Sequence, residues 1–254
     1  MRDWAASGSI KIDRANEHIR HLEAEISAFR ERRPYPLIRD PDFDSTLGTP
    51  FEIHVREEIP PRWSAIAADA IHNLHVALDY MWQRAIYGPN SGRHDHFPAF
   101  PNPEAAEARF KGKEKGNCKI AVNILKSAGT FKKENPFWDI RCFDDADKHD
   151  TMALVAQFLT GFQIDASAFP DAVMPPDWLF VPGPSGRAFV IEQGAILYAR
   201  TPMPKVDVNP ELTFEIAFGE GEVLNGQAVL PTLRHLAQTV DSLAAAFAEF
   251  GLLT

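Results

Sequence analysis

Three segments of the chain repeat apolar residues at the 3.6-residue period of an α-helix. Apolar residues in the longest of them occupy the a and d positions of three heptads: Val229, Leu233, Leu236, Val240, Leu243, Phe247 and Phe250. The two others have shorter stripes: Ile19, Leu22, Ile26 and Phe29, then Ile71, Leu74, Leu78 and Met81. Helices with narrow matching stripes usually pack on one another at shallow angles. We therefore expect a bundle of amphipathic helices within the chain, with a homodimer through the C-terminal helix as the alternative.

The region from 165 to 218 has a different composition, because frequent prolines exclude a long helix there. Within it, "LTFEIAF" alternates apolar and other residues from Leu212 to Phe218, which is typical of a half-buried strand. The segment "PFEIHV" near residue 50 alternates in the same way. We expect a single α+β domain over 1–254, in which helices pack with an antiparallel β-sheet. Its helical part covers about 10–150 and 225–252, and its β-rich part about 151–218.

Composition limits the classes of function. The chain has 26 basic and 35 acidic residues and a net charge of −9, which argues against binding nucleic acid or anionic membranes over the whole surface. No apolar run is long enough to span a bilayer, and the first ten residues do not resemble a secretory signal. Two cysteines without a CxxC pair predict neither a disulfide framework nor a cysteine zinc site. These observations favour a reduced, cytoplasmic protein.

The stretch "DAIHNLHVALD" places four polar residues on one stripe of the second predicted helix: Asp69, His72, His75 and Asp79. At about 100° per residue, this stripe lies nearly opposite the apolar stripe of the same helix. His72 and Asp79 are two turns apart, or about 10 Å along the axis, which is long for two ligands of one ion. Pairs at i,i+3 or i,i+4, such as His72 with Asp69 or His75 with Asp79, are better spaced.

A second polar cluster ends the segment "NPFWDIRCFDDADKHD", residues 135–150. Asn135 followed by Pro136 predicts a capped helix start. The predicted helix ends in a run of acids with one lysine and one histidine: Asp144, Asp145, Asp147, Lys148, His149 and Asp150. Acids at a helix C-terminus oppose the helix dipole, so this run is expected to have a local partner. A metal ion or a basic segment would be such a partner, and a role in acid–base chemistry would be another reason for the acidic run.

Together the two clusters resemble an uncharacterised bacterial protein family with a D-A-I-H-N-L-R-x-A-L-D helix and a later D-K-H-R element. The similarity covers roughly the first 160 residues. It implies that the first cluster, including Asn73, belongs with Asp147, Lys148 and His149, but it implies no reaction. This chain departs from the pattern at His75 and Asp150, where the family has arginine. The departure disfavours an anion-binding role at these positions and favours a set of metal ligands.

Our leading hypothesis is a hydrolase that acts on a small molecule. The catalytic candidates are His72, Asp79, Lys148 and His149, with Lys148 stabilising developing negative charge. The metal-ligand candidates are Asp69, His72, His75, Asp79, Asp147 and His149. Histidine and carboxylate together suit one divalent transition metal, zinc, manganese or iron.

Two other hypotheses stay open. In the first, the cluster is a buried hydrogen-bond network in a non-catalytic, partner-binding protein. In the second, the protein handles nucleotides or RNA, with His149 as base and the basic segment Arg109–Lys133 on phosphate. That segment carries a net charge of about +7, although such runs are usually solvated surface. The spacing from Arg141 to His149 is longer than the Arg–His motif of HEPN ribonucleases.

Overall fold

The computed structural model describes residues 4–39, 49–88, 95–112, 115–132, 135–147, 153–158, 189–199, 212, 214–219 and 223–253. Its helices are α1 (Trp4–Glu31), α2 (Arg62–Tyr87), α3 (Pro103–Phe110), α4 (Gly116–Ser127), α5 (Pro136–Asp147) and α6 (Val229–Glu249). Its strands are β1 (Leu37–Arg39), β2 (Thr49–Ile53), β3 (Leu154–Phe158), β4 (Phe189–Val190), β5 (Ile196–Ala199) and β6 (Phe214–Phe218). The predicted α+β class is confirmed.

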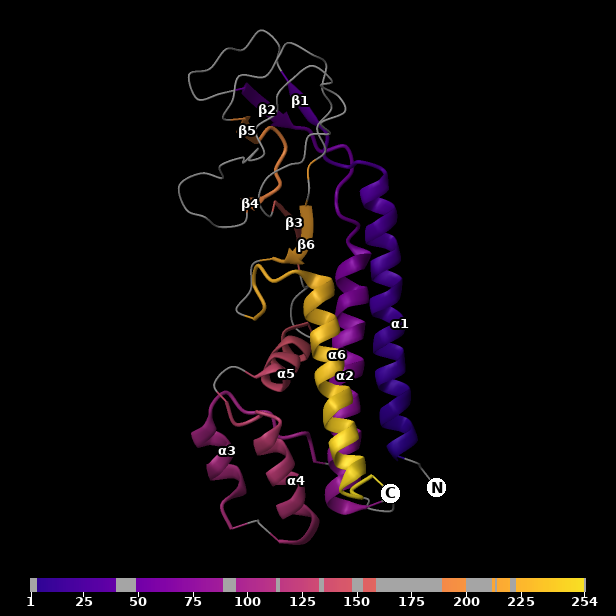
Figure 1. The fold of residues 1–254 in the computed structure, drawn as a ribbon, viewed down its shortest axis with the longest axis vertical. Helices are drawn as coiled ribbons and strands as arrows, with labels where there is room; N and C mark the ends of the chain where they lie inside the picture. The colour runs from indigo at the N-terminus through magenta and orange to yellow at the C-terminus, as the bar shows by residue number, and fades with distance from the viewer. Residues whose placement is uncertain are drawn as a thin grey trace, which may run out of the picture.

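Helices α1, α2 and α6 form a long bundle along the axis of the molecule (Figure 1). Helix α1 runs opposite to α2 and α6, so both termini lie at the same end. The three predicted apolar stripes meet in its core, where Leu22, Leu74 and Leu233 are fully buried. Within the described residues the C-terminal stripe from Val229 to Phe247 is buried, and α6 packs on α1 and α2 of the same chain, whereas the last residue of the stripe, Phe250, is 58% exposed. A homodimer through this helix stays a prediction.

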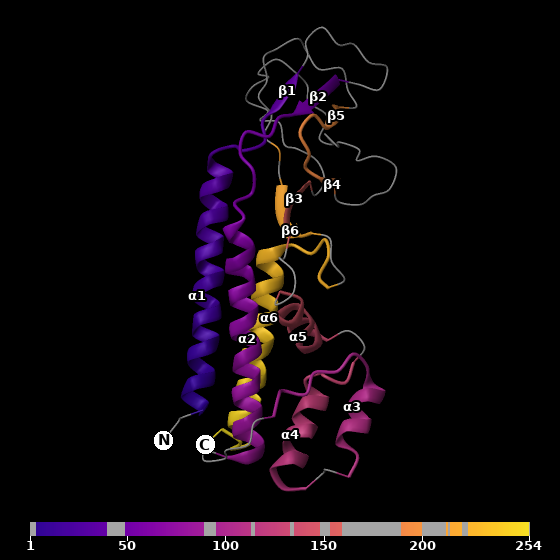
Figure 2. The same ribbon diagram turned by 180° about the vertical axis from the view of Figure 1, so that it is seen from behind.

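The described strands form two antiparallel sheets of three strands each, where the sequence analysis expected one sheet. One has the order β1-β2-β5 and the other β4-β3-β6. Strand β2 pairs with β5 from about 150 residues later, with Phe51 opposite Leu197. Strands β3 and β6 pair over their whole length, from Leu154 opposite Phe218 to Phe158 opposite Phe214. Both sheets lie toward the end of the bundle opposite the termini (Figures 1 and 2).

The predicted apolar face of "LTFEIAF" is confirmed, because Leu212, Phe214, Ile216 and Phe218 are all buried, but Ala217 on the opposite face is also fully buried, so the strand is not half-buried throughout. The ring of Phe214 packs on Phe29 of α1 and Tyr35. Arg30 of α1 donates a hydrogen bond to the Phe214 carbonyl at 3.1 Å. Aromatic packing and this hydrogen bond thus join the second sheet to the end of α1.

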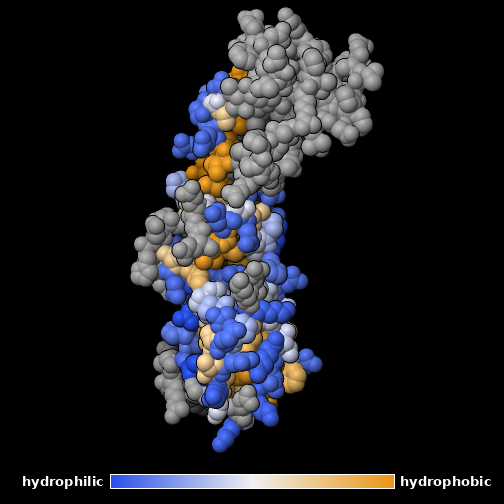
Figure 3. All heavy atoms as spheres, turned by 90° about the vertical axis from the view of Figure 1, so that its left-hand side faces the viewer, coloured by the Kyte–Doolittle hydropathy of each residue, from blue (hydrophilic) through white to orange (hydrophobic). Residues whose placement is uncertain are grey.

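Helices α3, α4 and α5 pack beside the lower half of the bundle in Figure 2. The described basic residues of the 109–133 segment lie on exposed surface: Arg109, Lys111, Lys115, Lys119, Lys126 and Lys132. On the face shown in Figure 3, hydrophilic residues cover most of this helical half, and apolar residues gather nearer the sheets. Among the described residues, no helix has the combination of length and hydropathy needed to cross a bilayer.

Candidate functional site

The packing of α5 on α2 brings residues of both predicted polar clusters together. Helix α5 begins as predicted, because the Asn135 side chain accepts a hydrogen bond from the backbone N–H of Trp138 at 2.8 Å. Phe137 and Ile140 anchor the helix, with exposed fractions of 1% and 0%. Asp144 follows on the same face, at i+7 and i+4 from them, and it is 4% exposed. An acid therefore occupies a core position of α5.

Asp144 holds two histidines of α2, one on each carboxylate oxygen. His72 Nδ1 lies 2.6 Å from Oδ1, and His75 Nδ1 lies 2.6 Å from Oδ2. The two histidines are three residues apart, so both project from one side of α2. The side chain of His72 is 53% exposed, whereas that of His75 is 14% exposed. A buried acid thus meets one accessible imidazole and one enclosed imidazole.

With Asp144 as an ionised carboxylate, these contacts assign the ring nitrogen that carries hydrogen. An ionised carboxylate only accepts hydrogen bonds, so each Nδ1 must be the donor. A neutral imidazole with hydrogen on Nδ1 has its lone pair on Nε2. The Nε2 atoms of His72 and His75 are therefore set up to accept a proton or bind a metal ion. For His72 this atom belongs to a half-exposed ring.

Asp147, one turn after Asp144 at the end of α5, belongs to the same electrostatic environment. Its pKa lies above the ordinary value, because partial loss of hydration at the end of α5 disfavours its charge, and Asp144 and Asp69 repel it, while His72 partly offsets the shift. Asp69 and Asp147 are both exposed. Three predicted site residues, Asp69, His72 and Asp147, are therefore electrostatically coupled around Asp144.

Within the described residues, the hydrogen bonds of the Asp79 carboxylate are to His96 and Phe97 rather than to the histidines of α2. Its Oδ2 lies 2.9 Å from His96 Nδ1, and its Oδ1 accepts the backbone N–H of Phe97 at 2.7 Å. Phe97 is buried, and its ring packs on Trp82 of α2 and Phe137 of α5. Asp79 thus attaches the segment after residue 94 to α2. The structure does not support its predicted pairing with His75 or a shared site with His72.

Lys148, His149 and Asp150 lie outside the described residues, so their predicted roles stay predictions. Within the described part of the chain, no three histidine, cysteine or acidic side chains are grouped as ligands for one ion. The predicted zinc, manganese or iron site therefore has two oriented imidazoles but no complete ligand set among these residues.

The sequence prediction did not single out Asp144 from the acids around it. One signal could have identified it: Phe137, Ile140 and Asp144 follow the i, i+3, i+7 spacing of a buried helix face. A carboxylate at such a position needs hydrogen-bond or charge partners. Asp145 lies off this face and is exposed, whereas Asp147 continues the same spacing one turn later, at the end of α5, where it is also exposed.

The site defined by these contacts is a carboxylate–histidine pair of the kind found in acid–base and metal sites. Comparisons with known protein families, with curated proteins and with solved structures gave no match to this chain. The resemblance noted in the sequence therefore stays an expectation, and the proposed function depends on the geometry of the site.

Proposed function

We propose that the protein is a hydrolase of a small molecule in which His72 is the general base. The supporting observation is the 2.6 Å contact between Nδ1 of the half-exposed His72 and the buried carboxylate of Asp144. In such a pair the acid orients the imidazole and stabilises the imidazolium that forms when Nε2 takes a proton. The arrangement supplies acid–base chemistry at a solvent-accessible nitrogen.

In this mechanism, Nε2 of His72 removes a proton from water as the water oxygen attacks an electrophilic carbonyl or phosphoryl centre. The same nitrogen then returns the proton to the leaving group. Asp144 remains a carboxylate throughout, and His75 holds its second oxygen. Because Asp144 is buried, its attraction for the imidazolium is less screened than it would be in water.

Hydrolysis of two chromogenic esters, p-nitrophenyl acetate and bis(p-nitrophenyl) phosphate, tests the proposal. We expect His72→Gln to lower the rate on the substrate that is turned over by about 10²–10⁴, the usual contribution of a general base. His96→Gln is the matched control, since His96 also contacts an acid, Asp79, through Nδ1 but is 85% exposed. Equal rates in wild type and His72→Gln would contradict the proposal, as would equal losses in both variants.

A metal-assisted reaction is the other form of the proposal, in which Nε2 of His72 binds the ion and therefore does not act as the general base. Metal-bound histidines usually donate their other ring N–H to a carboxylate, as His72 and His75 do to Asp144. A bound zinc, manganese or iron ion would lower the pKa of a coordinated water and make it a stronger nucleophile. Asp147 and His149 are the candidates for a further ligand. Elemental analysis of the purified protein should find such an ion at near one per chain, and His72→Gln should reduce it.

A non-catalytic role is the alternative, and the burial of Asp144 favours it. A buried acid with two histidine partners fixes the position of α5 on α2 without any reaction. The catalytic and structural roles predict different losses of stability when His72 is replaced. A structural network predicts a large loss of stability with His72→Ala, and a catalytic site predicts a small one.

A further inference from the structure

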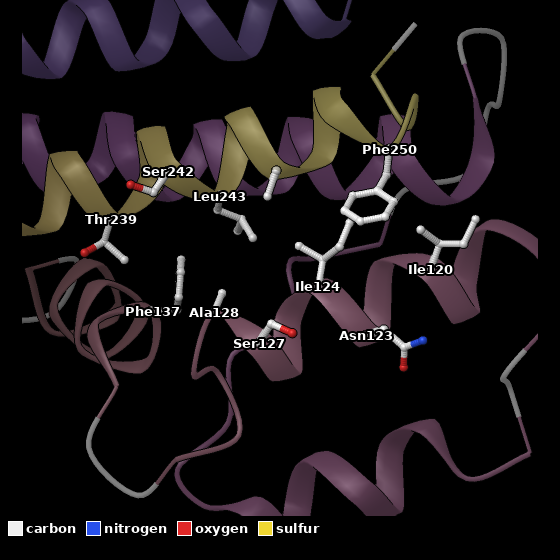
Figure 4. A pocket seen from close by; sticks show the side chains of 11 residues that line it. Ile120, Asn123, Ile124, Ser127, Ala128, Phe137, Thr239, Ser242, Leu243 and Phe250 are labelled. Carbon is white, nitrogen blue, oxygen red and sulfur yellow. The ribbon is translucent and has the colours of Figure 1, made fainter.

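A second feature of the fold is a pocket between α4 and α6, closed at one end by α5. It has a volume of about 710 Å³, within the range of small-molecule sites. Eleven residues line it: Ile120, Asn123, Ile124, Ser127, Ala128, Phe137, Thr239, Ser242, Leu243, Ala246 and Phe250. Figure 4 shows most of these side chains around the space between the two helices, with the amide of Asn123 turned away from α6 and the ring of Phe250 reaching from the end of α6 toward Ile124.

The lining of this pocket carries no charge. Seven of the eleven residues are apolar, and the other four are a neutral amide and three hydroxyl residues. Two hydroxyls already donate within α6, from Thr239 to the carbonyl of His235 and from Ser242 to the carbonyl of Gln238, both at 2.8 Å. A charged ligand group would lose hydration here without gaining an opposite charge. The lining therefore suits an uncharged ligand.

The pocket combines a buried floor with an apolar mouth. Phe137 and Leu243 are each 1% exposed, whereas Ile120 and Phe250 are 38% and 58% exposed. Large apolar side chains at an opening lose exposed area when an apolar molecule enters, which favours binding. A space of about 710 Å³ with a buried floor matches the size and burial of small-molecule sites. These features favour a small molecule over a protein partner.

We propose that the α4–α6 pocket binds an uncharged, mainly hydrocarbon small molecule. None of its lining residues belongs to α2, which carries His72, so this site is separate from the proposed hydrolase site. The ligand is recognised by its apolar body. The hydroxyl oxygens of Thr239 and Ser242 are acceptors for a single polar N–H or O–H group.

A fluorescence titration of the full-length protein tests this proposal with two probes that differ by one charged group. N-phenyl-1-naphthylamine is uncharged, and 8-anilino-1-naphthalenesulfonate carries a sulfonate on a similar skeleton. We expect saturable binding of the neutral probe at one site per chain, and binding of the sulfonate at least about ten-fold weaker. Absence of saturable binding, or a preference for the sulfonate, would overturn the proposal.

Neighbouring alanines on α6 provide matched variants. Ala246 lines the pocket, whereas Ala245 is exposed and does not. Ala246→Phe should fill the space and weaken binding of the neutral probe by about ten-fold or more, and Ala245→Phe should leave it within about two-fold. Ser127→Phe fills the pocket from α4 and provides a second test at an exposed position. Circular dichroism verifies that the variants are folded.

The variants also distinguish binding of a small molecule from self-association of the chain through the same face. If this face joined two copies of the chain, wild type would sediment as a dimer and Ala246→Phe, but not Ala245→Phe, would sediment as a monomer. That result would overturn the small-molecule assignment, as would wild-type affinity for the neutral probe in both filled variants. A monomeric wild type with weakened probe binding in Ala246→Phe and Ser127→Phe would support it.

Discussion

The carboxylate of Asp144 lies 2.6 Å from Nδ1 of His72, so a buried acid of α5 meets a half-exposed imidazole of α2. These residues are 72 positions apart in the sequence. Their contact depends on the packing of α5 against the long bundle helix. It is the basis of the proposed acid–base site and of the predictions about it.

His72→Ala and His75→Ala should differ in stability. His72 is 53% exposed and His75 is 14% exposed, so loss of His75 leaves a larger buried gap beside Asp144. We expect a loss of about 1 kcal/mol or less for His72→Ala and about 2 kcal/mol for His75→Ala. Urea unfolding measures both. A loss above about 2 kcal/mol for His72→Ala would favour the structural network over the catalytic site.

Asp144→Ala should be the most destabilising change at the site. It leaves the Nδ1 of both histidines without this acceptor and opens a gap at a core position of α5. We expect a loss of about 2–3 kcal/mol in the free energy of unfolding. Asp145→Ala on the same helix is the control, because Asp145 is exposed and its contact with Arg141 is 3.7 Å long. The loss in the free energy of unfolding for Asp145→Ala should stay within about 0.5 kcal/mol.

Asp147→Asn should stabilise the protein at neutral pH. Partial loss of hydration, with repulsion from Asp144 and Asp69, raises the pKa of Asp147 above 3.8, so its ionised form is less favourable in the folded state than in the unfolded state. This cost is present above the folded-state pKa and is lost as the pH falls through it. The melting temperature of Asp147→Asn should therefore exceed that of wild type at pH 7, and the difference should close in acid. A difference that widens in acid would contradict this assignment.

Glu25→Ala should weaken the contact between α1 and the start of α2. Burial would raise the pKa of Glu25, but hydrogen bonds from Arg62 and Trp63 outweigh it, and the pKa is lowered. Without Glu25, the indole N–H of the buried Trp63 loses its acceptor, at a cost of about 1–3 kcal/mol. The stability due to the Glu25 charge should be present above its unfolded pKa and lost as the pH falls through its folded value.

The control for Glu25→Ala is Glu17→Ala, which removes an exposed ion pair with Arg14 on the same helix. Its effect should stay within about 0.5 kcal/mol. Equal losses of stability in the two variants, measured by urea unfolding at pH 7, would show that the Trp63 hydrogen bond contributes no more than a surface pair.

The long helices could be predicted from sequence because their apolar period is a local signal. Leu22, Leu74 and Leu233 lie at predicted core positions and are fully buried. The division of the strands into two sheets could not be predicted in this way. Phe51 pairs with Leu197, and this choice of partner depends on how distant segments pack rather than on alternation within either strand.

The site was predicted only in part, for a similar reason. The polar stripe of α2 indicated His72 and His75, but helical spacing alone paired them with Asp69 and Asp79 of the same helix. In the structure their acceptor comes from α5, and Asp79 is used to hold His96 and Phe97. Spacing along one helix gives i,i+3 and i,i+4 neighbours, whereas partners from other helices depend on tertiary packing.

The ring nitrogen that carries hydrogen in His72 and His75 is the most direct measure of the proposed site. Long-range ¹H–¹⁵N NMR of uniformly labelled protein distinguishes the two neutral tautomers. The structure predicts hydrogen on Nδ1 of both rings in wild type, and loss of that preference in Asp144→Ala. Hydrogen on Nε2 of His72 in the wild-type protein would contradict the account, because that atom would then have no lone pair for a proton or a metal ion.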